Sequence, residues 1–187
     1  MMRTILFLIA FTLGLFAQEI SVGSTSTNGT GSTSSGYSYF GHDYPASGSG
    51  IIDSIRYVPG ITSPANDSVY VAVAYNTTGT SYVIRQWVGF TITGSLGVET
   101  GKALPDFEVQ EGDIKVYFCP TGGRIVKASN AEAHRLDWIA GKQAVGVEID
   151  LGAPEFSGNI MQFKLIGTAT ANGGNEYQPF QKWSKSW

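Results

Sequence analysis

Two tryptophans stand beside polar side chains in a setting that suits ligand recognition. Trp87 follows Arg85 and Gln86 directly, and Trp138 follows Asp137. An exposed indole ring can stack on the face of a sugar while neighbouring polar groups bond its hydroxyls. Tryptophans of small domains also often pack in the core, which is the competing interpretation for each of them. The sequence therefore predicts a ligand site formed by Arg85, Gln86, Trp87 and Trp138.

The single cysteine, Cys119, is the first candidate for catalysis, with His134 downstream as its base. A cysteine nucleophile needs a basic group within hydrogen-bond reach, and no local signature joins these two residues. Cys119 instead lies near the end of a predicted hairpin strand, a common position for a small packed side chain. We predict that Cys119 is a packing residue and that the chain has no catalytic residues.

Other enzyme motifs are missing from the sequence. There is no G-x-S-x-G elbow, no H-E-x-x-H and no phosphate loop. A glycosidase pair is defined by the separation of two carboxyl groups in space and leaves no sequence signature. A glycoside-active enzyme is thus the weaker alternative. The competing interpretation of its acidic residues is that they are solvated charges in turns and at strand edges. The candidate residues are Asp53, Asp106, Glu108, Glu111 and Asp113.

A structural calcium ion is a further prediction, because carboxylates near turns often hold this cation between the loops of a sandwich. None of the acidic residues follows an EF-hand pattern, so the sequence assigns no ligand set and no other cofactor. The acidic residues near predicted turns are Asp43, Asp67, Glu111, Asp113, Asp137 and Asp150.

The N-terminus predicts export from the cell. Residues 1–17 have a positive start at Arg3 and an apolar stretch of about a dozen residues, which suits a signal peptide better than a membrane span. Cleavage after Ala17 is expected; the alternative is a hydrophobic strand or anchor that stays in place. Residues 18–49 follow as a Ser/Thr/Gly-rich and aromatic segment, in which 21–36 is predicted to be a flexible linker.

The composition is typical of an extracellular all-β domain. Only 14% of residues are charged, the formal net charge is −3, and the chain has 24 glycines. Many glycines allow many turns between short strands. The lack of a basic stripe argues against nucleic acid as a partner, and no later segment is apolar enough to cross a membrane.

Apolar residues alternate with a period of two from residue 50 onward, as in β-strands. One S-x-x-E capping box, Ser129 and Glu132, predicts a short helix of about two turns over 131–138. We expect an all-β, two-sheet antiparallel sandwich over 50–171, jelly-roll-like, with that one helix. The predicted strands lie at 51–58, 68–75, 81–92, 106–109, 113–119, 124–128 and 160–170.

The last residues, 172–187, form an aromatic tail with polar spacing. Rings recur every three to four residues, although Pro179 prevents a regular helix. Such a tail can dock on its own domain or contact a second subunit. The predicted interface residues are Tyr177, Phe180, Trp183 and Trp187.

The region from Gly50 to about Gly167 resembles jelly-roll domains of phage tail and fibre proteins and of secreted bacterial proteins. The resemblance is carried by IIDSIRYV, SVYVAVAYNTTGTSYVIRQW and VQEGDIKVYFCPTGGRI, with Trp138 before the Gly141 turn. It implies a fold similar to carbohydrate-binding modules and supplies no catalytic residue.

These observations lead to a secreted, non-catalytic surface protein that binds glycans or acts in adhesion. Its partner would be a polysaccharide or a cell-surface glycan. The alternative is a self-assembling structural subunit of an extracellular filament, surface layer or virion, whose partners are copies of itself.

Overall fold

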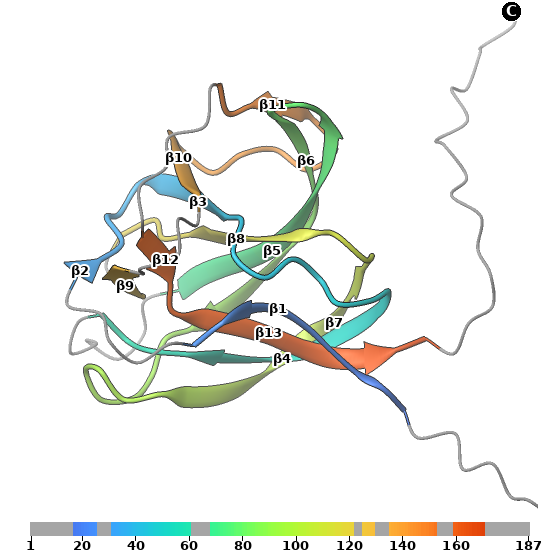
Figure 1. Ribbon diagram of the computed structural model, residues 1–187. Coiled ribbons are helices and arrows are strands. Elements are labelled where there is room, and N and C mark those ends of the chain that lie inside the picture. The colour runs from blue at the N-terminus through green and yellow to red at the C-terminus, as the bar shows by residue number, and fades with distance from the viewer. Residues whose placement is uncertain are drawn as a thin grey trace, which may run out of the picture.

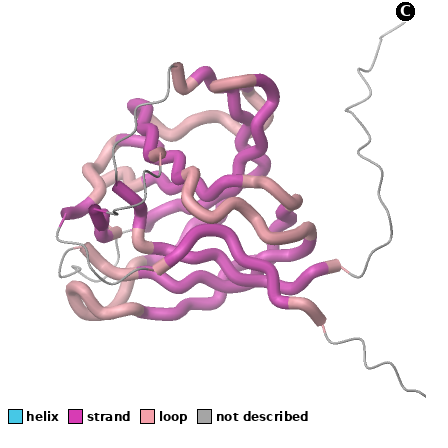
Figure 2. The backbone as a smooth tube through the Cα atoms, viewed as in Figure 1, coloured by secondary structure: helices cyan, strands magenta, loops and turns pink. Residues whose placement is uncertain are grey.

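The computed structural model describes residues 17–25, 31–60, 68–121, 125–129, 135–152 and 159–170. These residues form strands joined by turns and loops, with no helix among them (Figures 1 and 2). In this part of the chain, accordingly, no helix is long and apolar enough to span a membrane. The predicted all-β class is confirmed.

A six-stranded antiparallel sheet forms one layer, in the order β10-β3-β8-β5-β6-β11. Its two longest strands, β5 and β6, cover the predicted strands at 68–75 and 81–92 and pair as a hairpin. The strands of this sheet are β3 (Tyr37–Gly41), β5 (Ser68–Thr78), β6 (Ser81–Thr91), β8 (Ile114–Phe118), β10 (Leu136–Ala140) and β11 (Glu148–Asp150).

A four-stranded antiparallel sheet forms the second layer, in the order β1-β13-β4-β7. Figure 1 shows it below the larger sheet, and a third, small sheet with the order β12-β9-β2 closes one end. The strands of these sheets are β1 (Glu19–Ser24), β4 (Gly50–Tyr57), β7 (Thr100–Val109), β13 (Phe163–Ala169), β2 (Gly31–Ser32), β9 (Val126–Ser129) and β12 (Asn159–Met161).

The main core lies between the two large sheets and follows directly from the period-two pattern. In β5, Val69, Val71 and Val73 point into this core, while Ala72 and Ala74 belong to a second cluster on the outer face. A strand whose two faces are both buried has apolar residues on both faces. Strand β5 has this pattern, and it lies inside the sheet, between β8 and β6. The predicted two-sheet antiparallel sandwich is confirmed.

The predicted linker at 21–36 is wrong for the residues that the structure describes. Residues 21–24 belong to β1, which pairs with β13 along its whole length. Ile20 and Val22 are buried in the main core, and strand pairing through the backbone tolerates Ser21 between them and Gly23 and Ser24 after them. Strand β3 likewise carries residues of the 18–49 segment into the larger sheet.

The predicted helix at 131–138 is also wrong for residues 135–138, the part of it that the structure describes. Residues 136–140 form β10, which pairs antiparallel with β3. Leu136 is buried in the main core and Ile139 packs on the outer cluster, so the two faces of β10 are both used. Residues 130–134, which contain most of the expected first turn, lie outside the described residues.

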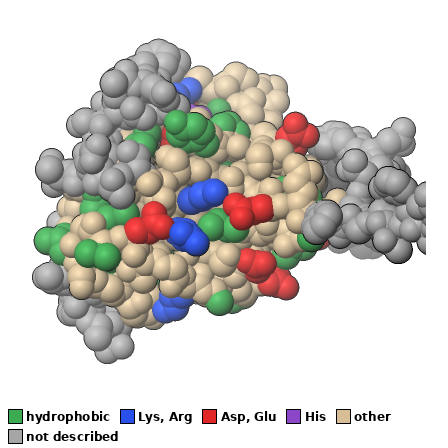
Figure 3. Space-filling model, turned by 60° about the horizontal axis from the view of Figure 1, so that its bottom comes forward, with side chains coloured by type: hydrophobic (Ala, Val, Ile, Leu, Met, Phe, Trp, Pro, Cys, Tyr) green, Lys and Arg blue, Asp and Glu red, His purple; other side chains and the backbone are tan. Residues whose placement is uncertain are grey.

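The outer surface carries mixed charge. The face turned forward in Figure 3 shows basic and acidic side chains interspersed. Two ion pairs belong to the four-stranded sheet and the loop before it: Arg56 with Glu99 at 3.2 Å, and Lys164 with Glu19 at 3.3 Å. All four side chains are substantially hydrated, so these pairs add little to stability.

Candidate ligand-binding site

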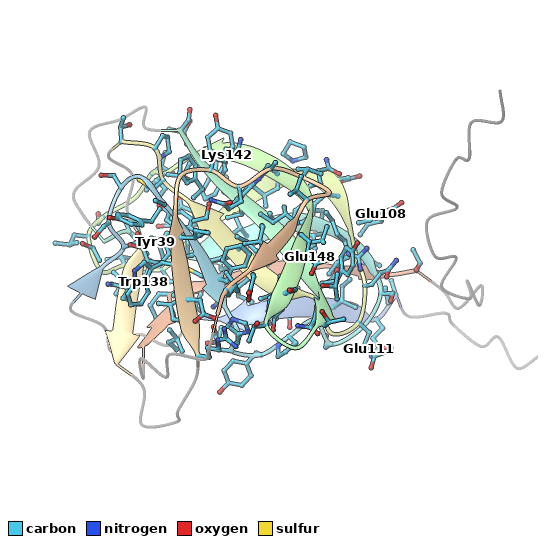
Figure 4. All side chains as sticks on the ribbon, turned by 90° about the horizontal axis from the view of Figure 1, so that it is seen from above. Tyr39, Glu108, Glu111, Trp138, Lys142 and Glu148 are labelled. Carbon is cyan, nitrogen blue, oxygen red and sulfur yellow. The ribbon has the colours of Figure 1, made fainter. Side chains whose placement is uncertain are left out.

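An aromatic cleft lies where the β3–β10 edge of the larger sheet meets the small sheet. Strand pairing places Trp138 of β10 opposite Tyr39 of β3, and Figure 4 shows the two on the same side of the molecule. The cleft has a volume of about 270 Å³. It is lined by Ser34, Tyr37, Tyr39, Lys127 and Trp138.

The three rings reach one place because of strand geometry. Residues two apart in a strand share a face, so Tyr37 and Tyr39 point the same way. Antiparallel pairing with β10 adds Trp138 to that face, next to the cross-strand partner Tyr39. At this edge of the sheet the face is open to solvent, whereas further along it is covered by the four-stranded sheet.

The three aromatic side chains differ in exposure: the buried one supports the cleft, and the exposed ones can contact a ligand. Trp138 is 49% exposed and Tyr37 39%, while Tyr39 is buried at 4%. The rings of Tyr37 and Tyr39 lie 6.5 Å apart with their planes tilted by 58°. The Tyr39 hydroxyl accepts a 2.7 Å hydrogen bond from the Ser34 backbone N–H, which fixes the inner ring. Trp138 and Tyr37 are left as the surfaces that a ligand can touch.

Lys127 supplies the charged group of the cleft. It lies on β9, in register with Gly31 of β2. A methyl group built on Gly31 would stand 3.7 Å from Lys127 Cβ and 4.0 Å from its Cε, so the lysine stem runs alongside this glycine. An ammonium group beside aromatic faces suits a ligand with several oxygen acceptors.

Trp87 is held in a different region, on the outer face of the larger sheet. Its indole Nε1 donates a 2.8 Å hydrogen bond to the backbone carbonyl of Gln143. The ring packs edge-on against Phe118, with 6.4 Å between centroids, and the Lys142 ammonium lies 5.5 Å from the ring centroid. Because its N–H and much of its ring are already engaged, Trp87 fastens the 141–147 segment to the sheet.

Arg85 and Gln86 do not join either tryptophan in a single site. Arg85 is the unpaired residue of a bulge in β6, and its guanidinium makes a forked contact with Asp113, with Nε 2.7 Å from Oδ2. Gln86 pairs with Val73, whereas Trp87 pairs with Ala72, so their side chains leave opposite faces of the sheet. The predicted group of Arg85, Gln86, Trp87 and Trp138 is therefore split, and only Trp138 lines the cleft.

A second polar cluster joins β3, β10 and β6 on the outer face. His42 Nε2 lies 2.9 Å from Asp137 Oδ2, and the Tyr82 hydroxyl lies 3.3 Å from His42 Nδ1. Arg135 forms an ion pair with the same Asp137 carboxylate. Burial lowers the pKa of His42 below its usual value, and the attraction of Asp137 only partly offsets this. The neutral ring, with its proton on Nε2, satisfies both neighbours.

The position of Cys119 confirms the packing prediction. Its side chain is fully buried within the main core, beside Tyr117. The thiol points between the sheets, on the same face as Lys115 and Tyr117 and opposite Phe118, because side chains alternate along a strand. His134, its suggested partner, lies outside the described residues.

Among the described residues, the acidic candidates belong to no group of three or more potential metal ligands. The carboxylate pair of a glycoside-active enzyme stays a prediction. Asp113 and Asp137 have basic partners, and Asp150 accepts hydrogen bonds from Thr80 and the Gly152 N–H. Glu108 and Glu111 are exposed at the far end from the cleft in Figure 4. Asp67 lies outside the described residues, and a calcium ion stays a prediction without a ligand set.

The remaining predicted site residues, in the aromatic tail, also fall outside the part of the chain that the structure describes. Nothing in the fold tests their assignment as an interface. The same holds for residues 1–16 of the predicted signal peptide. These four tail residues are Tyr177, Phe180, Trp183 and Trp187.

Sequence reasoning missed Ser34 and Lys127 and did not connect Tyr37 and Tyr39 with Trp138. The spacing of the tyrosines was a usable signal, but only the pairing of β3 with β10 brings the tryptophan to them. Searches of protein-family models, curated proteins and solved structures found no match for this chain.

Proposed function

We propose that this protein is a secreted, non-catalytic surface protein that binds glycans or acts in adhesion, with the aromatic cleft as its binding site. The observation that carries the proposal is the grouping of exposed Trp138 and Tyr37 over buried Tyr39. Aromatic faces attract the C–H face of a sugar ring, and the buried tyrosine holds the platform in place without moving on binding.

The size and polarity of the cleft favour a short saccharide. A volume of about 270 Å³ is small for a ligand site and suits one or two sugar residues at the end of a chain or along it. Lys127 adds a hydrogen-bond donor beside the rings. A shallow site of this kind binds weakly on its own, as expected for a module that acts through many copies on a surface.

The test is binding of the purified chain to a panel of soluble polysaccharides, followed by calorimetry on any that bind. Trp138→Ala and Tyr37→Ala should each weaken binding at least tenfold. Tyr44→Ala is the matched control, because Tyr44 is as exposed as Trp138, at 49%, but follows the opposite end of β3. Equal binding by all three variants would exclude the cleft as the site.

Truncation after Asn172 distinguishes this function from self-assembly. A binding module keeps its affinity without residues 173–187, whereas a structural subunit built through its aromatic tail loses its polymers. Light scattering of the full and truncated chains measures this directly. Polymers that vanish on truncation, together with no polysaccharide binding, would replace the present proposal with the structural one.

A further inference from the structure

A lysine and an aspartate face each other between the two large sheets, away from the cleft. Lys115 is 0% exposed and Asp43 is 1% exposed, with 2.8 Å between Nζ and Oδ2. Full burial of an opposite-charge pair is costly, since both ions lose their hydration. Neither residue takes part in the proposed ligand site, so the fold places them together for another reason.

The lysine amine is oriented by two further contacts. Nζ donates to the backbone carbonyls of Met161, at 2.7 Å, and Phe163, at 3.1 Å. A third N–H donates to Asp43 Oδ2 at 2.8 Å. Once that proton passes to the carboxylate, the amine is neutral, its two N–H bonds keep the carbonyl acceptors, and its lone pair points at the Asp43 carboxyl. Burial lowers the pKa of Lys115, which favours this neutral form.

The carboxyl group is equally restricted. Asp43 Oδ1 is buried and has no hydrogen-bond partner in the described structure, while Oδ2 faces Nζ and lies 3.5 Å from the Ser24 hydroxyl. A buried carboxylate ion is expected to have its oxygens satisfied, whereas the carbonyl oxygen of an amide tolerates an unfilled acceptor position better. The orphan oxygen thus fits a neutral acyl group.

The surrounding backbone is shaped around this pair. A methyl group on Gly23 would lie 2.5 Å from Lys115 Cδ, and one on Gly41 would lie 2.8 Å from its Cε. Tyr44, directly after Asp43, has a φ of +47°, a strained value for a residue with a side chain. The two glycines thus leave room for the lysine stem, and the turn at Tyr44 directly follows the carboxyl group.

We infer that Lys115 and Asp43 form an intramolecular isopeptide bond in the folded protein. Within the pair, the ammonium proton passes to the carboxylate, giving an amine and a carboxylic acid. The Nζ lone pair attacks Asp43 Cγ, and a Cγ–O bond breaks as the Nζ–Cγ bond forms. The oxygen leaves as water with the carboxyl proton and one amine proton, and the Ser24 hydroxyl is placed to relay a proton. No oxidant or cofactor is required.

The product links the loop after β3 to β8 and closes a loop of 72 residues between the two side chains. The amide keeps one N–H, which can still donate to the Met161 carbonyl. Positioning accelerates the reaction, because a nucleophile and an acyl group held together in a buried site react as a single molecule.

The experiment is intact-mass measurement and peptide mapping of the purified wild-type chain after overnight incubation. The linked chain is lighter by one water molecule, and trypsin yields a branched peptide that joins residues 103–124 to the peptide ending at Arg56. An unmodified mass, or loss of water mapped to any other position, overturns the inference. This readout needs no variant and so does not depend on the folding of one.

Two controls sharpen the result. Lys115→Met and Asp43→Ala should each have the mass calculated from its own sequence, with no loss of water. Both should migrate more slowly than the wild type in a denaturing gel. The exposed Lys164–Glu19 pair is an internal control with the same chemical groups, at 3.3 Å, in water. Its peptides should be recovered unlinked, and water loss that persists in both variants would contradict the assignment.

Discussion

The two tryptophans predicted to bind a ligand occupy opposite situations in the fold. Trp87, in the middle of the long strand β6, donates its indole N–H to the Gln143 carbonyl and packs on Phe118. Trp138, on the edge strand β10, is half exposed above Tyr39. The difference teaches that the polar neighbours of a tryptophan in sequence are a poor guide to its role, and that its place at the centre or edge of a sheet decides.

The largest effect is expected from removing the fastening tryptophan. Trp87→Ala should lower the free energy of unfolding by about 3 kcal/mol, because it leaves a cavity against Phe118 and an unpaired Gln143 carbonyl. Urea unfolding measures this. Trp87→Phe, which keeps a ring but loses the N–H, should cost about 1 kcal/mol. The glycan affinity of either folded variant should equal that of the wild type. A loss of glycan affinity in a variant that is still folded would place Trp87 in the glycan-binding site.

Trp138, on the edge strand, is expected to matter for glycan binding and not for stability. Trp138→Ala should reduce glycan affinity about 30-fold, or about 2 kcal/mol, as for the removal of a central aromatic anchor. Its unfolding free energy should change by less than about 0.5 kcal/mol, because half of the ring is already in water. Calorimetry and urea unfolding on the same sample test both statements. Destabilisation as large as that of Trp87→Ala would remove the contrast between the two regions.

The outer-face cluster that holds β10 beside β3 predicts a dependence on pH. His42 has its pKa lowered in the folded state, so the unfolded chain binds the proton at a higher pH. Stability from the neutral ring is therefore present above the unfolded value of 6.5 and falls as the pH drops below it. The slope for one proton reaches at most about 1.4 kcal/mol per pH unit.

Urea unfolding between pH 5 and pH 8 measures that slope. Asp137, Arg135 and Tyr82 are polar groups around the ring, and the Asp43 carboxylate also acts to raise its pKa. His42→Gln should be less stable than the wild type at pH 8 but should lose less stability on acidification. An identical slope in the variant would assign the acid sensitivity to other groups.

The smallest effect is expected from the lone cysteine in the core. Cys119→Ala should cost about 1 kcal/mol, because it removes one buried sulfur atom from a tightly packed position. Glycan binding should be unchanged, since the thiol is enclosed between the sheets and does not line the cleft. A loss of binding with an intact fold would overturn the packing role of Cys119.

The sequence alone determined the secondary structure of much of the sandwich and the faces of its strands. Alternation in β5 and β8 assigned Val71 to one side and Ala72 to the other, and it placed Lys115, Tyr117 and Cys119 together. Alternation is local, because each residue in a strand must point away from its neighbour. The all-β class and the packing role of the cysteine followed from it.

Only the tertiary structure decided which segments meet. Serines and glycines gave no sign that 21–24 pairs with β13, since pairing through backbone groups leaves little trace in the side chains. A local capping signal favoured a helix that includes 136–138, but pairing with β3 and burial of both faces made it a strand. The cleft, the divided tryptophans and the Lys115–Asp43 contact all join residues far apart in sequence, and such contacts depend on the order of strands in the sheets.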